Sequence, residues 1–391
     1  MNLKHLLAGS VLGVALAGCG SAQPSIGAPV GTMPQTATTS QYQVIYSFGG
    51  SPDGGKPHAG LLYINGKLYG TTIAEGTGNA GTIFSVSTSG AEKVLHSFAG
   101  SGDGSAPSAG LYHIKDNLYG TTTYGGANGF GAVFTIKESG EDESVIHSFG
   151  SGDGTNPVAA LIRVGGPLYG TTEHGGAGDT GAIFAMTPSG TESVLHSFGG
   201  SGDGTYPYGS LLDASGVLYG TTRNGGSVNN GTVFAIRKSG SHETVLHSFK
   251  GGATDGKYPV SGLIDVGGVL YGTTYIGGAS DDGTVFEVTP SGTESILYSF
   301  KGAPDGFHPS AGLTSVNGTL YGTTTQGGSN SLGTLFAITP SGAESVIHSF
   351  GSTAGDGATP SAGLTNVNGT LYGTTSAGGA NAFGTVFSLI P

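Results

Sequence analysis

The sequence predicts an all-β fold, a seven-bladed β-propeller with four antiparallel strands per blade and the last blade closed by the N-terminal strand. Three markers support this prediction, because each occurs seven times at a spacing of about 50 residues. The first is Leu-Tyr-Gly-Thr-Thr, with its tyrosine at Tyr69, Tyr119, Tyr169, Tyr219, Tyr271, Tyr321 and Tyr372. The second is His/Tyr-Ser-Phe, which ends at Phe48, Phe98, Phe149, Phe198, Phe249, Phe300 and Phe350. The third is Asp-Gly followed by proline. A repeat of about 50 residues that fills the chain indicates a propeller or a solenoid.

One repeat contains four short segments of β-forming composition. In residues 107–149 they are Ala109–Ile114, Leu118–Thr123, Ala132–Lys137 and Ser144–Phe149. Tight turns join the first pair and the last pair, and other copies have Asn-Gly there, a dipeptide that two-residue hairpins favour. Four antiparallel strands in about 50 residues make one propeller blade.

The two ends of the repeat region predict a closed ring. The region opens with a lone fourth strand, Tyr42–Phe48, and stops after a third strand, Gly384–Ile390. The N-terminal strand therefore completes the last blade and leaves no free sheet edge. A linear solenoid would need polar capping repeats instead, and the sequence shows none.

The N-terminal region predicts export and a lipid anchor. Residues 1–18 read as a signal peptide with Lys4 before a short apolar stretch, too short to span a membrane. The ending Leu-Ala-Gly-Cys resembles the bacterial lipobox, which implies acylation of Cys19 and anchoring by the buried acyl chains. An ordinary signal peptide that happens to contain a cysteine is the alternative. Residues 19–41 then form a flexible tether, and residues 42–391 form the propeller.

The repeat unit as a whole resembles a known family. Ala-Gly-Leu, Leu-Tyr-Gly-Thr-Thr, Gly-Gly, Gly-Thr-Val-Phe and Ser-Phe are similar to the GloVer tandem repeat of bacterial exported proteins, and the strand layout is similar to the kelch unit. The resemblance implies the architecture and export, and no particular activity. Because the cysteine is followed by Gly20 and Ser21 rather than aspartate, we expect the protein in the cell envelope, at the outer membrane or cell surface.

Composition excludes one class of partner. The net charge is −12, and the 13 lysines and arginines are scattered, so counterion release cannot drive binding to nucleic acid. We expect a monomer without a cofactor, attached to the membrane only through its anchor.

The loop-bearing face is the predicted binding surface. In a propeller, the connection between blades and the loop after the second strand emerge on one face, and here both are long. Aromatic and basic residues gather there in blades four to six. The predicted ligand-binding residues are Tyr206, Tyr208, Arg223, Tyr258, Tyr275 and His308. Aromatic faces beside polar groups suit a sugar ring or a peptide, and the alternative is a surface of ordinary loop tyrosines.

The repeated polar residues are interpreted as structural. The histidine of His-Ser-Phe is tyrosine at Tyr46 and Tyr298, an exchange that a hydrogen bond between blades accepts and a metal site does not, so no metal site is expected. The repeated Asp-Gly aspartates are expected to cap the amides of their own turns. Known catalytic motifs are missing, and Glu173-His174 reads as a solvated pair. Two functions stay open: a binding or scaffold module for a glycan or envelope protein, and a propeller enzyme of lyase, hydrolase or lactonase type. A purely structural role in the envelope is the third.

Overall fold

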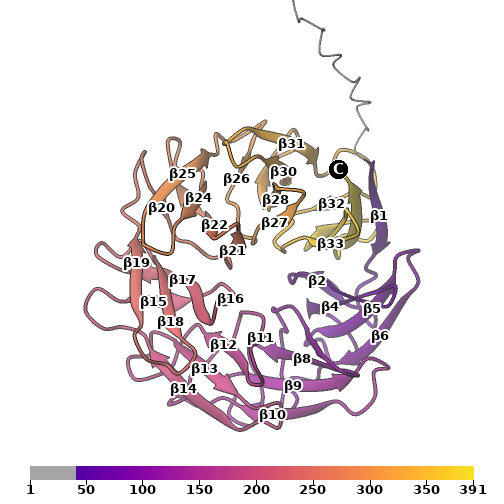
Figure 1. Ribbon diagram of the computed structural model, residues 1–391. Helices are drawn as coiled ribbons and strands as arrows, with labels where there is room; N and C mark the ends of the chain where they lie inside the picture. Colours follow the sequence, from indigo (N-terminus) through magenta and orange to yellow (C-terminus); the bar gives the residue numbers. More distant parts are fainter. Residues whose placement is uncertain (1–40) are drawn as a thin grey trace, which may run out of the picture. The chain divides into compact units, whose positions relative to one another are not determined.

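The computed structural model describes residues 41–391, in which every regular element is a β-strand. Seven antiparallel four-stranded units surround a central axis as the blades of a propeller, with the first strand of each blade nearest the axis (Figure 1). The predicted fold class is confirmed. Residues 41–391 hold no helix that could cross a membrane. The predicted signal peptide, Cys19 and most of the tether lie outside the described residues.

The blades follow one another along the chain. The first four consist of β3 (Leu62–Ile64), β4 (Lys67–Ala74), β5 (Thr82–Ser87) and β6 (Glu92–Ser97); β7 (Tyr112–Ile114), β8 (Asn117–Thr122), β9 (Ala132–Lys137) and β10 (Ser144–Ser148); β11 (Ile162–Arg163), β12 (Leu168–Thr172), β13 (Ala182–Met186) and β14 (Glu192–Ser197); and β16 (Leu212–Ala214), β17 (Val217–Gly225), β18 (Thr232–Arg237) and β19 (Thr244–Ser248). The last three consist of β21 (Ile264–Val266), β22 (Val269–Thr274), β24 (Thr284–Val288) and β25 (Glu294–Ser299); β27 (Thr314–Val316), β28 (Thr319–Thr324), β30 (Thr334–Ile338) and β31 (Glu344–Ser349); and β33 (Thr365–Val367), β34 (Thr370–Thr375), β36 (Thr385–Ile390) and β1 (Gln41–Ser47).

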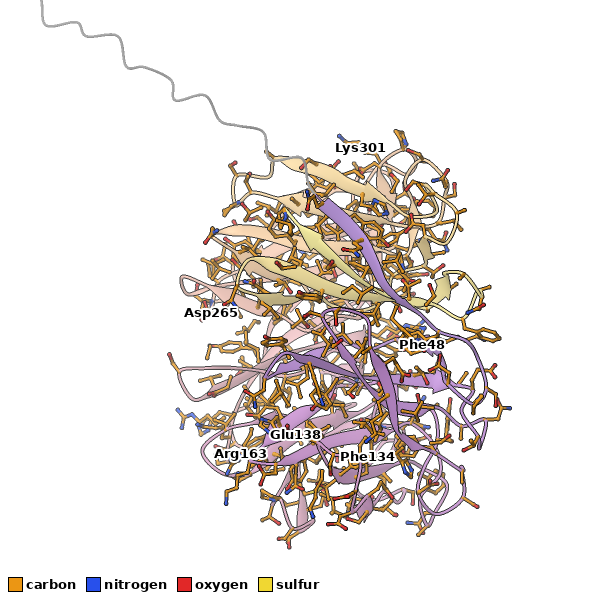
Figure 2. The ribbon with its side chains drawn as sticks, turned by 90° about the vertical axis from the view of Figure 1, so that its right-hand side faces the viewer. Phe48, Phe134, Glu138, Arg163, Asp265 and Lys301 are labelled. Carbon is orange, nitrogen blue, oxygen red and sulfur yellow. The ribbon has the colours of Figure 1, made fainter. Side chains whose placement is uncertain are left out.

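The ring is closed as predicted, because the first strand belongs to the last blade. β1 pairs antiparallel with β36, from Gln41 opposite Ile390 to Ser47 opposite Thr385. Figure 2 shows β1, in purple, running along the yellow strands of the last blade toward Phe48. The two ends of the repeat region therefore cover each other's unpaired backbone groups.

Short additional strands place the two longer loops on one face. β2 (Gly55–Pro57) pairs with the end of β4, and β15 (Gly204–Pro207) pairs with the end of β17. The last three blades repeat this pairing with β20 (Gly256–Lys257) and β23 (Ile276–Gly277), β26 (Gly306–Phe307) and β29 (Gln326–Gly327), and β32 (Gly357–Ala358) and β35 (Ala377–Gly378). The connection that enters each of these blades thus lies against the start of its own loop after the second strand.

The hydrophobic core is divided into layers between neighbouring blades. In each layer a phenylalanine that follows the fourth strand meets the ring of a phenylalanine on the third strand of the next blade, as Phe98 meets Phe134. The seven pairs have ring centroids 5.0–5.4 Å apart in edge-to-face geometry, which the charge distribution of aromatic rings favours. The repeated Tyr-Gly glycine makes room for this layer, because a Cβ on Gly70 would lie 2.6 Å from Phe84 Cζ.

Candidate functional site

The seven innermost segments meet around a central cavity of about 450 Å³. Each segment follows the repeated proline and leads through small residues to a buried leucine. Glycine lets these segments approach closely, because a Cβ on Gly60 would lie 3.3 Å from the carbonyl oxygen of Gly363 in the neighbouring segment. The first cavity-lining residue after each proline differs between blades: His58, Ser108, Val158, Tyr208, Val260, Ser310 and Ser361.

Tyr208 and His58 are the two large polar side chains among these seven positions. Tyr208 is 39% exposed, and its partial burial raises the pKa of its phenol. The charge of Glu173 adds to that rise, whereas Arg223 lowers the pKa of Tyr208, so both groups act on this wall of the cavity. His58 lies 3.2 Å from the hydroxyl of Ser361, and burial lowers the pKa of its imidazole.

A repeated backbone feature directs the residue before each proline toward the preceding blade. Tyr206, Tyr258 and His308 hold φ values of 57°, 58° and 58°, in the left-handed region. Their N–H groups donate to carbonyl oxygens in the loop of the blade before, for example from Tyr206 to Thr180 at 2.8 Å. Each side chain consequently lies against the first residues of that neighbouring loop.

Three successive blade junctions therefore carry a side-chain pair. Tyr206 meets His174 edge-to-face, with ring centroids 5.1 Å apart. Tyr258 has the Arg223 guanidinium 6.0 Å from its ring centroid. His308 stacks on Tyr275 with centroids 4.4 Å apart and the ring planes 13° from parallel. We call these pairs and Tyr208 the aromatic arc.

The structure thus brings four of the six predicted residues together in two pairs, Arg223 with Tyr258 and Tyr275 with His308. Tyr206 pairs with His174 instead, and Tyr208 lies in the cavity wall. That these six residues bind one ligand stays a prediction. The sequence interprets His174 as part of a solvated pair, and the structure adds its contact with Tyr206.

A second set of polar side chains lies at the outer side of each blade junction. The histidine or tyrosine before Ser-Phe contacts the aspartate of the following Asp-Gly turn in all seven copies. The pairs are Tyr46–Asp53, His96–Asp103, His147–Asp153, His196–Asp203, His247–Asp255, Tyr298–Asp305 and His348–Asp356, at 2.7–3.4 Å. The aspartates also accept backbone N–H groups of their turns, as Asp153 does from Gly150 at 2.6 Å. The interpretation as hydrogen-bonding and turn-capping residues is confirmed, and tyrosine replaces histidine because both can donate to the carboxylate.

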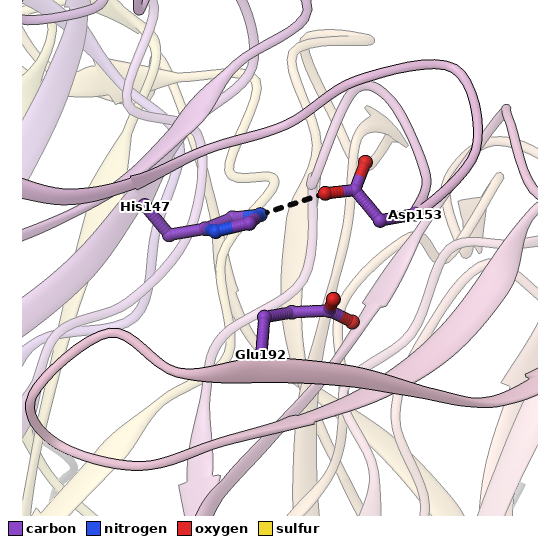
Figure 3. A group of neighbouring side chains, drawn as sticks. All are labelled: His147, Asp153 and Glu192. Carbon is purple, nitrogen blue, oxygen red and sulfur yellow. Dashed lines mark hydrogen bonds and ion pairs between the residues drawn. The ribbon is translucent and has the colours of Figure 1, made fainter.

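A repeated glutamate lies beside six of these pairs. Figure 3 shows the carboxylate of Glu192, from β14, beneath the His147–Asp153 pair. One carboxylate oxygen of each glutamate is buried without a hydrogen-bond partner in the described part of the chain: Glu92, Glu143, Glu192, Glu243, Glu294 and Glu344. Burial raises the pKa of four of them to about 7, those of Glu92, Glu192, Glu294 and Glu344.

At the seventh junction Tyr42 stands where the other blades have glutamate. Its ring stacks on His348, with centroids 3.7 Å apart and planes 12° from parallel. Burial raises the pKa of Tyr42, and the negative charge of the neighbouring Asp356 raises it further. The closing strand β1 therefore contributes an aromatic ring where the other six junctions have a glutamate.

Comparisons with known proteins support the repeat and the fold. A family model described as the Gloeobacter/Verrucomicrobia repeat matches residues 9–234, 87–280 and 207–391. No curated protein matches the chain by sequence.

Among solved structures, an oligogalacturonate lyase in complex with manganese is 10% identical with a TM-score of 0.56, covering 90% of this chain and 96% of that one. A puromycin hydrolase mutant is 11% identical with a TM-score of 0.52, covering 82% of this chain and 50% of that one. At these identities the likeness shows the propeller fold alone.

Proposed function

The chain belongs to the Gloeobacter/Verrucomicrobia repeat family, and we propose that it is a binding module that recognises a glycan at the loop-bearing mouth of its central cavity. The aromatic arc is the observation that carries this proposal. Sugar rings present apolar C–H faces that stack on aromatic side chains, and their hydroxyl groups bond to nearby polar groups. Tyr208, Tyr258 and Arg223 offer both kinds of contact within one sector of the ring.

The fold itself does not require aromatic residues at these positions. The residue before the proline has φ of 51° at Ala106 and 54° at Thr359, close to the 57° of Tyr206. Small side chains therefore support the same backbone and the same contact with the preceding blade. The concentration of large side chains in blades four to six is better explained by a ligand than by folding.

Export and anchoring complete the proposal. A signal peptide at residues 1–18, acylation of Cys19 and a tether over residues 19–41 would hold a monomeric propeller at the cell envelope. In a variant of this proposal the partner is an envelope protein, and the aromatic arc binds a peptide segment of that protein.

One observation favours a second candidate, a propeller enzyme of lyase, hydrolase or lactonase type. The arc brings titratable groups near the cavity wall: His174 Nε2 is 4.0 Å from Glu173 Oε1, and Glu173 acts on the phenol of Tyr208. A base and an acid at a cavity mouth are what proton transfer to or from a sugar requires. This candidate predicts that a bound glycan is converted to product.

A glycan-binding experiment tests the proposal and separates it from the alternative. The purified protein is screened against neutral and acidic oligosaccharides and envelope fractions, and affinities are measured by calorimetry. Tyr208→Ala or Tyr258→Ala should weaken binding by about 1–3 kcal/mol, as truncation of an aromatic anchor does. Thr359→Ala, at the position equivalent to Tyr258 in the last blade, is the matched control and should bind normally. Glycan turnover would favour the enzyme, and full affinity in the Tyr208→Ala/Tyr258→Ala variant would refute the site.

A further inference from the structure

Three potential metal ligands converge at the junction between the fourth and fifth blades, away from the cavity. His247 lies on β19, Asp255 on the connection to the fifth blade and Glu294 on β25. His247 Nε2 is 3.4 Å from Asp255 Oδ1 and 3.9 Å from Glu294 Oε2. One ligand atom from each residue lies within 4.8 Å of the other two. One imidazole nitrogen and two carboxylate oxygens thus surround a common point.

Glu294 has a buried oxygen that nothing in the described chain satisfies. Its side chain is only 9% exposed, and its Oε1 has no hydrogen-bond partner among residues 41–391. Asp255 differs, because its two oxygens accept the N–H groups of Gly256 and Lys250, each at 2.7 Å. A buried carboxylate oxygen without a donor is unfavourable, so a proton, a water molecule or a cation beside Glu294 would stabilise it.

We propose that His247, Asp255 and Glu294 bind one divalent transition-metal ion. Ligands about 2.1 Å from a tetrahedral zinc ion lie about 3.4 Å from one another, close to the separations in this triad. The side chain of His247 is 16% exposed, so the triad is not sealed from solvent. Any proton on the three ligand atoms leaves to solvent when the ion binds.

The ion would link the fourth and fifth blades to the connection between them, and this connection carries Tyr258 of the aromatic arc. Asp255 is followed directly by β20, and Tyr258 comes next in the chain. Binding to the folded state alone would also stabilise the ring against unfolding. Two further triads have the same residue types: His147, Asp153 and Glu192, and His196, Asp203 and Glu243.

The chain provides its own metal-free version of the triad. At two other junctions a tyrosine replaces the histidine, and Tyr298 donates to Asp305 at 2.8 Å beside Glu344. These junctions keep the hydrogen bond but lose the imidazole ligand. His247→Tyr therefore copies an arrangement that the fold already accommodates.

Zinc counting tests the proposal. The purified protein is treated with chelator, titrated with Zn²⁺ by calorimetry and analysed for bound metal after gel filtration. His247→Tyr should bind one equivalent of zinc fewer than the wild type, with an unchanged melting temperature in chelator and a smaller rise on adding zinc. Glu294→Gln, which keeps the shape of the side chain, should lose the same equivalent if His247→Tyr folds poorly.

His242→Ala, which removes an exposed histidine near the same strand, is the control and should leave the zinc count unchanged. Equal zinc counts in wild type and in both triad variants would overturn the proposal. Failure of the wild type to bind zinc at micromolar concentration would also overturn it.

Discussion

Replacing Phe48 by alanine tests whether the closure of the ring is as tightly packed as the junctions between consecutive blades. Phe48 directly follows β1, is fully buried, and meets Phe84 of the first blade edge-to-face with centroids 5.0 Å apart. Removing a buried phenylalanine side chain costs about 3–5 kcal/mol, because the lost burial is followed by incomplete collapse of the cavity. With an unfolding entropy of about 2.1 cal/mol/K per residue over roughly 350 residues, a loss of 4 kcal/mol lowers the melting temperature by about 5 °C.

Phe249→Ala is the matched comparison, since Phe249 is fully buried and meets Phe286 at 5.1 Å inside the continuous part of the chain. Denaturant unfolding of both variants should give equal losses within about 1 kcal/mol if β1 is docked as the fourth strand of the last blade. A loss below about 1 kcal/mol for Phe48→Ala, beside a loss of several kcal/mol for Phe249→Ala, would refute the closed ring.

Three other predictions concern the anchor, the junction carboxyls and a missing hydrogen bond. Cys19→Ser should move the protein from the membrane fraction to the soluble fraction and abolish labelling with palmitate; persistent labelling would contradict the anchor. Burial raises the pKa of Glu92 and Glu344 to about 7, so the folded state binds more protons than the unfolded state between pH 4.5 and 7. Stability should therefore fall as pH rises through this range, and the Glu92→Gln/Glu344→Gln variant should show a shallower fall in denaturant melts at pH 5, 6, 7 and 8. The Thr172 hydroxyl has no hydrogen-bond partner among residues 41–391, whereas equivalent threonines, such as Thr222, pair with a threonine where this blade has Ala182. Ala182→Thr should raise the free energy of unfolding by about 0.5–1.5 kcal/mol; an unchanged value would show that the hydroxyl is already satisfied.

The blade count and the closure could be predicted because they depend on contiguous residues. Each copy of Leu-Tyr-Gly-Thr-Thr lies within one strand, as in β8, and hairpin partners are a few residues away. The repeat region opens with a fourth strand, and that strand, β1, pairs with β36 in the last blade. Local pattern and global fold agree in every repeat, and such agreement makes a sequence informative about its fold.

The loop-bearing face could also be predicted, but the partners of its side chains could not. The positive φ at Tyr206, Tyr258 and His308 turns each side chain toward the preceding blade, so Tyr258 contacts Arg223 of that blade as well as Lys257 beside it in the chain. The sequence around these residues does not reveal which way their side chains turn. It follows from the N–H contact between two blades, which forms only when the ring is assembled.

By itself the sequence determined the repeat, the strands and turns within it, the number of blades, the closing strand and the face that carries the long loops. Only the tertiary structure decided which repeated residues meet across blades. His247 and Glu294 are 47 positions apart, and Tyr42 and His348 are 306 apart, yet each couple meets at one junction. The physical reason is that strand periodicity is encoded along the backbone, whereas the distance between two strands' side chains depends on how the blades twist and stack around the axis.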